Sequence, residues 1–286
     1  MKNLTLKSLA KLRPFSPRER FLVLEISRGG AGGFAFSVTK DRSIRIRKRW
    51  GKFPREQFLE RFAKLMRKRK TIIVADPAIA FTMFLPMRLD RDRGFLKEPI
   101  GLLELENLIA KEIGRVFAAC RREASAALGI EELDTILVGS RAGAFRVDGY
   151  KVLDPTGFEG KRIDGILELT LTTRELFEGW NEFFSARENF FFTEQARAEL
   201  AVLEKFEGSA ANLLMIRPGW ALAFILESAP RGTVIYRSGI PWGTDRLPEA
   251  IGAALGTDRA VAERLYELYR AGDVSDAVRR SIERIL

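Results

Sequence analysis

The side chains of this sequence leave few routes to catalysis, because it contains no histidine and one cysteine. The absence of histidine excludes Ser-His-Asp and Cys-His nucleophiles and His-ligated metals. Cys120 falls on the apolar face of a predicted helix, which is typical of a small core residue. We therefore expect no catalytic residue and no metal site. An enzyme of this composition would depend on carboxylates, lysines or a bound nucleotide.

The cysteine count and hydropathy also bear on location. A single cysteine forms no internal disulfide, which favours a reducing compartment, and we expect a cytoplasmic protein. No apolar run approaches the length of a spanning helix, and residues 1–15 lack the unbroken apolar core of a signal peptide. Residues 2–13 place Leu4, Leu9 and Leu12 among lysines, a pattern that can lie on an anionic membrane.

The basic residues gather in the first quarter of the chain. Residues 1–70 hold 21 Lys/Arg and 5 Asp/Glu, a net charge of +16, whereas residues 71–286 have a net charge of −6. Two clusters stand out: Arg42, Arg45, Arg47, Lys48, Arg49 and Lys52, and Arg61, Lys64, Arg67, Lys68, Arg69 and Lys70. The first alternates with Ile44 and Ile46, which predicts a half-exposed strand. The second closes an amphipathic helix, where cations complement the helix dipole.

Three interpretations of this basic quarter stay open: a solvated face, a surface for an anionic membrane or acidic partner, and a nucleic-acid site. Nucleic acid is disfavoured, because the clusters lack interleaved aromatic residues and any groove-reading motif.

Periodicity predicts an α/β protein that begins with a three-stranded meander followed by a helix and a strand. Strands are expected at residues 21–26, 34–38, 43–50, 71–74, 134–140, 145–147, 150–153, 163–172, 213–216, 221–226 and 233–238. Helices are expected at residues 54–69, 102–128, 173–182, 193–206, 247–255, 258–269 and 273–285. Gly129 should end the long helix, and Asp148-Gly149 should form a primed hairpin turn.

Two blocks of sequence carry a resemblance to a known family. The first contains Asp148, Gly149, Val152, Asp154, Pro155, Gly157 and Gly160, and it is similar to the D-G-x-x-V-x-D-P-x-G-x-x-G pattern in the small domain of the actin-like FtsA family. The second block, residues 238–245 with Ile251, Leu255 and 262–264, resembles that family's I-P-x-G-G stretch and the helices after it. Turn residues of the first kind also occur in unrelated folds.

The resemblance implies the organisation of the chain. An actin-like (ribonuclease H-like) first half would comprise residues 1–77 plus 173–207. A small α+β domain would be inserted at residues 78–172, and an incomplete second half would occupy residues 208–286.

The family's two phosphate-binding turns are altered in this sequence. The first, D-x-G in the family, corresponds to Glu25, Ser27 and Arg28. The second, D-x-G-G-G-T, corresponds to residues 214–220 with Arg217 and Gly219; Pro218 removes an N–H donor and Trp220 is bulky. Phosphate binding by such turns needs converging N–H groups and small residues. We expect a vestigial nucleotide site without ATP hydrolysis and without a cofactor. Weak binding of ATP and Mg²⁺, with Arg28 or Arg217 as counter-ion, is the alternative.

The function implied is that of a non-catalytic, FtsA-like scaffold. It would bind protein partners in cell division or envelope assembly, at the inner face of the membrane through the basic quarter. The alternatives are a PilM-like adaptor for pilus or secretion assembly, and a divergent ATPase completed by a partner chain. Homo-oligomerisation is left open.

Overall fold

The computed structural model describes residues 20–39, 43–54, 57, 62, 65–66, 69–92, 94, 97–184, 190–206, 211–217, 219–229 and 232–285. The amphipathic segment at residues 2–13 and most of the predicted helix at residues 54–69 lie outside this set. So do Arg42, Arg61, Lys64, Arg67 and Lys68 of the two basic clusters. The chain divides into two compact units, Met1–Ser209 with Glu227–Val234 and Ala210–Leu226 with Ile235–Leu286.

The first sheet has five strands in the order β3-β2-β1-β4-β9. Its strands are β1 (Arg20–Ser27), β2 (Gly30–Val38), β3 (Ile44–Phe53), β4 (Lys70–Ala75) and β9 (Phe190–Glu194). The first three form an antiparallel meander, and β4 and β9 continue the sheet in parallel with β1. The mixed sheet, together with the helices that follow β4 and β9 along the chain, confirms the predicted α/β class, whereas the actin-like first half at residues 1–77 plus 173–207 stays a prediction.

The core of this part lies on one face of the sheet. Leu22, Leu24 and Ile73 point to that face and are fully buried. They pack with Phe62, Met66 and Leu176, the last from α4 (Arg174–Phe184). The side chains of Phe21 and Val23 are buried as well, although they alternate with Leu22 and Leu24 along β1, so this strand is buried on both faces as its continuous apolar run predicts. The helix α5 (Gln195–Phe206) follows β9.

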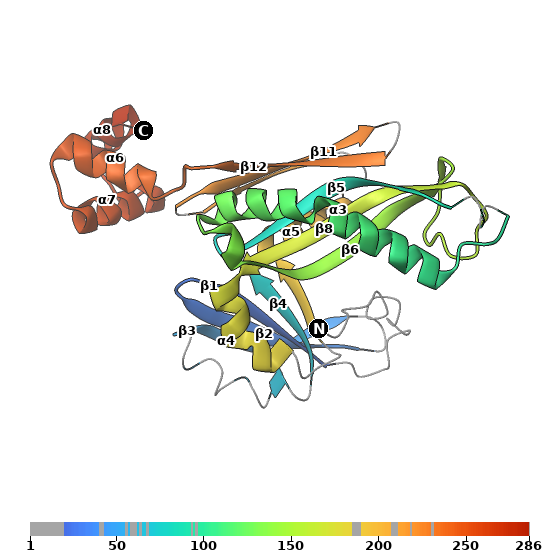
Figure 1. The fold of residues 1–286 in the computed structure, drawn as a ribbon. Helices are drawn as coiled ribbons and strands as arrows, with labels where there is room; N and C mark the ends of the chain where they lie inside the picture. The colour runs from blue at the N-terminus through green and yellow to red at the C-terminus, as the bar shows by residue number, and fades with distance from the viewer. Residues whose placement is uncertain are drawn as a thin grey trace. The chain divides into compact units, whose positions relative to one another are not determined.

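A second sheet of four strands, in the order β5-β8-β6-β7, comes between β4 and α4 along the chain. The strands are β5 (Ala80–Asp90), β6 (Thr135–Val147), β7 (Tyr150–Lys151) and β8 (Arg162–Thr173), all antiparallel. The helix α3 (Leu102–Leu128) lies along one face, as Figure 1 shows, and the short helix η2 (Glu132–Asp134) leads into β6.

The long helix behaves as its sequence predicts. Cys120 is 1% exposed within its core, and burial raises the pKa of the thiol. Gly129 has a φ of 66° and donates to the last carbonyls of the helix, which confirms it as the residue that ends α3. Whether residues 78–172 form a separate domain stays a prediction, because the Thr82 N–H also donates to Glu194 of the first sheet.

The second unit contains most of a three-stranded sheet and three helices. The strands β10 (Ala211–Ile216), β11 (Ala221–Ala229) and β12 (Gly232–Ile240) lie in that order. The helices are α6 (Arg246–Leu255), α7 (Arg259–Ala271) and α8 (Asp276–Ile285), close to the predicted bounds. They share a small core around Ile251, Ala262 and Ile282.

Three local predictions are corrected. The helix expected at residues 193–206 begins at Gln195, because Phe190–Glu194 is a strand that pairs with β4. The strands expected at residues 134–140 and 145–147 are one strand, β6, with register shifts. The first basic cluster lies on β3, but residues 43–49 are exposed on both faces because β3 is an outer strand. Across the described residues, no helix is long and apolar enough to span a bilayer.

Candidate functional site

The first candidate turn joins β1 to β2 and contains Glu25, Ser27 and Arg28. Ser27 pairs with Gly30 across a tight hairpin, and the Ser27 hydroxyl donates to the Gly30 carbonyl at 3.2 Å. Glu25 lies two residues earlier on β1, with an exposed side chain. The hydroxyl of Ser27 is therefore directed into its own hairpin.

The side chain of Arg28 is used in contacts within the protein. Its Nη2 donates to the carbonyl of Ala78 at 3.2 Å and to that of Leu128 at 3.3 Å. Leu128 is the last residue of α3, where unpaired carbonyls carry the negative end of the helix dipole. Arg28 thus ties the β1–β2 turn to the end of α3.

The glycines that follow this turn are explained by close strand packing. A Cβ at Gly30 would meet the carbonyl oxygen of Phe53, and one at Gly33 would meet the carbonyl oxygen of Val23. Gly29 differs, since nothing lies within 4 Å of its Cβ position. Gly30 and Gly33 therefore allow the backbones of β1, β2 and β3 to approach each other closely, because glycine has no Cβ.

Replacing Arg28 by alanine is expected to lower the free energy of unfolding by about 1 kcal/mol, because two backbone carbonyls lose a charged donor. Urea denaturation measures this loss, with Arg20→Ala on the exposed start of β1 as the control. Equal stability of the two variants would show that the Arg28 contacts contribute nothing.

The second candidate turn, with Arg217 and Gly219, joins β10 to β11 in the second unit. The Arg217 N–H donates to the Trp220 carbonyl at 2.8 Å, and the Arg217 carbonyl accepts the Thr244 N–H at 3.0 Å. The backbone of Arg217 is thus engaged on both sides. Gly219 is exposed, and Pro218 lies outside the described residues.

Sequence reasoning missed two acidic residues at the edge of the first sheet where parallel strands end. Asp76 follows β4, and its Oδ1 accepts the Ala78 N–H at 2.8 Å. Glu194 ends β9, is fully buried, and its Oε2 accepts the Thr82 N–H at 2.6 Å. The signal for Glu194 is an acid that follows three phenylalanines and Thr193, but residues 193 and 194 fall at the start of the helix predicted at residues 193–206.

A partly buried ion pair lies beside this edge. The Arg197 guanidinium is 2.9 Å from the Glu168 carboxylate, and it lies over the ring of Phe84. Glu168 is on β8 and Arg197 on α5, so the pair joins the second sheet to the helix that follows β9. No group of three or more acidic or cysteine side chains suited to a metal is found among the described residues.

The first FtsA-like block forms a loop held by Asp148. This residue has a φ of 49° in the turn between β6 and β7, and its N–H donates to the Arg162 carbonyl. Its carboxylate accepts the backbone N–H groups of Lys161 and Arg162 at 2.9–3.1 Å. A Cβ at Gly160 would meet the side chains of Val147 and Asp148. The hydrogen bonds of Asp148 and the close packing at Gly160 therefore explain why these two residue types occur at this spacing.

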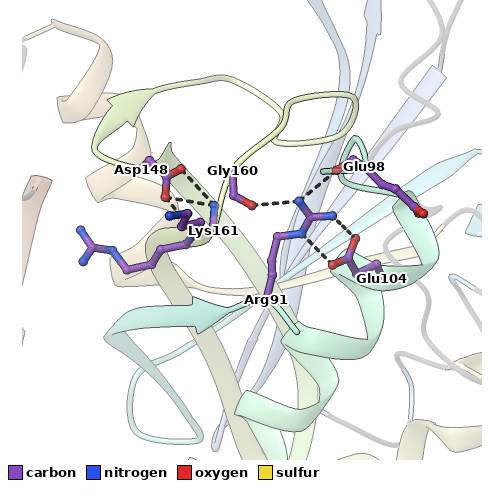
Figure 2. A network of polar contacts seen from close by, with 7 residues as sticks. Arg91, Glu98, Glu104, Asp148, Gly160 and Lys161 are labelled. Carbon is purple, nitrogen blue, oxygen red and sulfur yellow. Dashed lines mark hydrogen bonds and ion pairs between the residues drawn. The ribbon is translucent and has the colours of Figure 1, made fainter. Parts of the chain in front are cut away.

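Arg91 connects this loop to α3, as Figure 2 shows. Its guanidinium donates to both carboxylate oxygens of Glu104 at 2.7 and 2.9 Å. A further nitrogen donates to the carbonyls of Glu98 and Gly160. The Arg91 side chain is 0% exposed, so its charge is neutralised inside the domain by this bidentate pair.

The ion pair shifts the ionisation of both partners. The hydrogen bonds from Arg91 hold the pKa of Glu104 below its usual value, although burial opposes the shift. The same hydrogen bonds raise the pKa of Arg91. Because the folded state binds the Glu104 proton more weakly than the unfolded state does, the pair contributes stability above a pH of about 4.3 and loses it as pH falls through the lowered pKa.

We therefore expect the stability difference between the wild type and Glu104→Gln to be large at neutral pH and to shrink as pH falls below about 4.3. Urea midpoints across this range measure it. Glu123→Gln, an exposed change on the same helix, controls for general acid effects. A difference that stays constant with pH would contradict this account of the ion pair.

The described part of the basic quarter includes Arg45, Arg47, Lys48 and Arg49 on β3. All four side chains are exposed on this outer strand. The Arg47 Nε donates to the Ser37 hydroxyl at 3.2 Å, and Lys48 lies over the ring of Trp50. These residues form a positive edge that attracts anions.

Comparisons with known proteins complete the description of the site. No family model matches the chain, and no curated protein matches it. Among solved structures, the chain is similar to one from a PilM–PilN type IV pilus biogenesis complex, with 14% identity, coverage of 92% of this chain and 72% of that one, and a TM-score of 0.45. It is also similar to a Bacteroides thetaiotaomicron protein of actin-like ATPase fold and unknown function, with 8% identity, 85% and 79% coverage, and a TM-score of 0.42. A third is the cytoplasmic domain of EpsL, an inner membrane component of the Vibrio cholerae type II secretion system, with 7% identity, 76% and 71% coverage, and a TM-score of 0.35.

Proposed function

We propose that this chain is a non-catalytic, actin-like scaffold that acts through protein contacts in cell division or envelope assembly. The observation that carries the proposal is how the side chains are bonded at the position of the family's first phosphate-binding turn. Arg28 donates to the carbonyls of Ala78 and Leu128, and Ser27 donates to Gly30. These side chains hold the protein together where the family's turn would hold phosphate.

The second turn supports the same proposal. The backbone N–H and carbonyl of Arg217 are hydrogen-bonded to Trp220 and Thr244 of the same unit. A phosphate-binding turn needs small residues, whereas this one contains Pro218 and Trp220. The cell-division role depends on the FtsA-like blocks. A PilM-like adaptor in pilus or secretion assembly is the alternative within the same class.

A divergent ATPase completed by a partner is the second candidate, and Glu194 favours it. This buried carboxylate ends a parallel strand at the same edge of the sheet as Ser27. Ligands of open α/β sheets bind at this edge. In the scaffold account, Glu194 instead fixes β5 to β9 through the Thr82 N–H.

Phosphate release and thermal melting separate the two candidates. A nucleotide present at about 100 times its dissociation constant stabilises the folded state by about 2.7 kcal/mol, which is easily seen as a melting shift. The scaffold account expects no shift with Mg-ATP and no phosphate release above background. Release that disappears in Glu194→Gln would favour the ATPase.

The location proposed is peripheral, at an anionic membrane surface. Basic residues near an anionic leaflet contribute about 1 kcal/mol each, so a few of them hold a protein reversibly. We expect salt-sensitive co-sedimentation with anionic vesicles, weakened by removing residues 1–13 and by replacing Arg45, Arg47 and Arg49 with glutamine. Equal binding to neutral vesicles would assign the basic quarter to a solvated or protein-docking face.

A further inference from the structure

The outer strand β10 has the sequence of an internal strand. Its residues, Ala-Asn-Leu-Leu-Met-Ile, form a nearly continuous apolar run without charge or proline. Such runs are typical of strands that are covered on both faces and paired on both edges. Among the described residues, however, β10 pairs with β11 alone. The first strand of the other meander, β1, has β4 on the corresponding side.

The hydrogen-bonding direction along β10 follows from its hairpin. The Arg217 N–H donates to the Trp220 carbonyl, and Ile216 is in register with Ala221. Because hydrogen-bonded positions alternate in antiparallel pairs, the backbone groups of residues 213 and 215 face β11. The N–H and C=O groups of Asn212, Leu214 and Ile216 therefore face outward.

One face of this sheet is also apolar and uncovered. Leu214 and Ile216 lie on the same face of β10, and Ile225 is on that face of β11 through its register with Asn212. Leu214 is 57% exposed, and Ile216, Ile225, Tyr236 and Ile240 are exposed as well. Exposed apolar side chains gathered on neighbouring strands, as on β10 and β11, mark an interaction surface.

The outer strand β3 is protected from pairing in ways that β10 is not. Outer strands are commonly protected from pairing by charged side chains and bulges. β3 has both, with Arg45, Arg47, Lys48 and Arg49 and a register shift opposite Ala35 and Phe36. β10 has neither, because its register with β11 is unbroken and it contains no charge.

Charge favours a second copy of this chain as the occupant. The second unit, residues 210–226 and 235–286, contains nine arginines and eight acidic residues, a net charge of +1. Two copies that meet through this unit therefore repel each other little. Contact through residues 1–70, with a net charge of +16, would place strongly repelling surfaces together.

We propose that β10 pairs with β10 of a second copy and so joins two three-stranded sheets into one of six strands. A two-fold axis makes such a pair antiparallel and self-complementary. With the axis at Leu214, each Leu214 lies opposite its symmetry mate, and Asn212 lies opposite Ile216 of the other copy. All three outward-facing residues then find backbone partners, and the apolar faces become continuous.

Sedimentation equilibrium of the full chain tests the proposal, with a dimer as the expected state. Leu214→Lys places like charges directly opposite each other and should weaken dimerisation about 100-fold. Leu214→Glu should do the same. A mixture of the two variants should form a heterodimer, because opposite charges then face each other across the axis. A monomeric wild type, or variants that dimerise like it, would overturn the proposal, as would separate variants that fail to associate when mixed.

Leu214→Pro tests the backbone pairing separately from the apolar patch. It removes an outward N–H and leaves the bonds to β11, and proline is tolerated on such an edge. It should abolish the dimer without altering the far-ultraviolet circular dichroism. Ile44→Lys is the matched control, since Ile44 is 67% exposed on β3, an outer strand of the first sheet, and it should leave the dimer unchanged. Loss of the dimer in Ile44→Lys as well, or a dimer that survives Leu214→Pro, would contradict strand pairing at β10.

Discussion

Replacing Arg91 by alanine is expected to lower the free energy of unfolding by about 3 kcal/mol. The change leaves the Glu104 carboxylate without its bidentate partner and the Gly160 carbonyl without its donor. Removing one member of a buried ion pair is costly because the other charge stays in a poorly solvated site. Glu104 is partly exposed, so we expect a value at the low end of that range. Urea denaturation followed by circular dichroism measures the loss.

Two variants control this prediction. Arg91→Lys keeps the charge but cannot reproduce the two parallel hydrogen bonds, so an intermediate loss is expected. Arg88→Ala removes an exposed arginine on β5, just before Arg91, whose distance to Asp90 is 3.5 Å, and it should lower the free energy of unfolding by less than about 0.5 kcal/mol. If Arg91→Ala were no less stable than Arg88→Ala, the hydrogen bonds of Arg91 would contribute nothing to the stability of the fold.

Replacing Gly33 by alanine is expected to lower the free energy of unfolding by about 3 kcal/mol, because the new methyl group has no room. Its Cβ would collide with the backbone carbonyl oxygen of Val23. Val23 belongs to β1, which β2 and β4 hold from both sides, so the carbonyl has little room to move. The expected result is a large drop in melting temperature, or no folded protein at all.

Gly29→Ala is the matched control for Gly33→Ala. It lies in the same glycine run, but no atom approaches its Cβ position within 4 Å. It should leave the melting temperature nearly unchanged. A similar loss in both variants would mean that the run is needed for turn flexibility rather than for close packing.

The elements that were predicted most closely are those whose own residues form a recognisable pattern. The three strands of the first meander follow from short apolar runs, and α3 follows from its apolar stripe and Gly129. The primed turn at Asp148-Gly149 has positive φ at both residues, as the dipeptide predicts. In α7, the Asp258 carboxylate accepts the Val261 N–H at its start, so this helix begins near the predicted residue.

The features that escaped prediction depend on residues far apart in the chain. β9 pairs with β4 across more than a hundred residues, and its last two residues, Thr193 and Glu194, lie at the start of the helix predicted at residues 193–206. Two of the three partners of the Arg91 side chain, Glu104 and Gly160, lie 13 and 69 residues away, so no local pattern reports them. The candidate residues of the two phosphate turns follow from the family resemblance alone. The sequence did not reveal that Arg28 reaches the end of α3, because that contact spans 100 residues.

The central claim, that the phosphate-turn positions hold the protein together instead of holding nucleotide, is tested most directly by titration calorimetry of the full chain with Mg-ATP. We predict no saturable heat for the wild type, for Arg28→Ala or for Arg217→Ala, with Arg28→Ala altered in stability alone. Saturable binding of Mg-ATP with a micromolar dissociation constant, lost in Arg217→Ala, would contradict the claim.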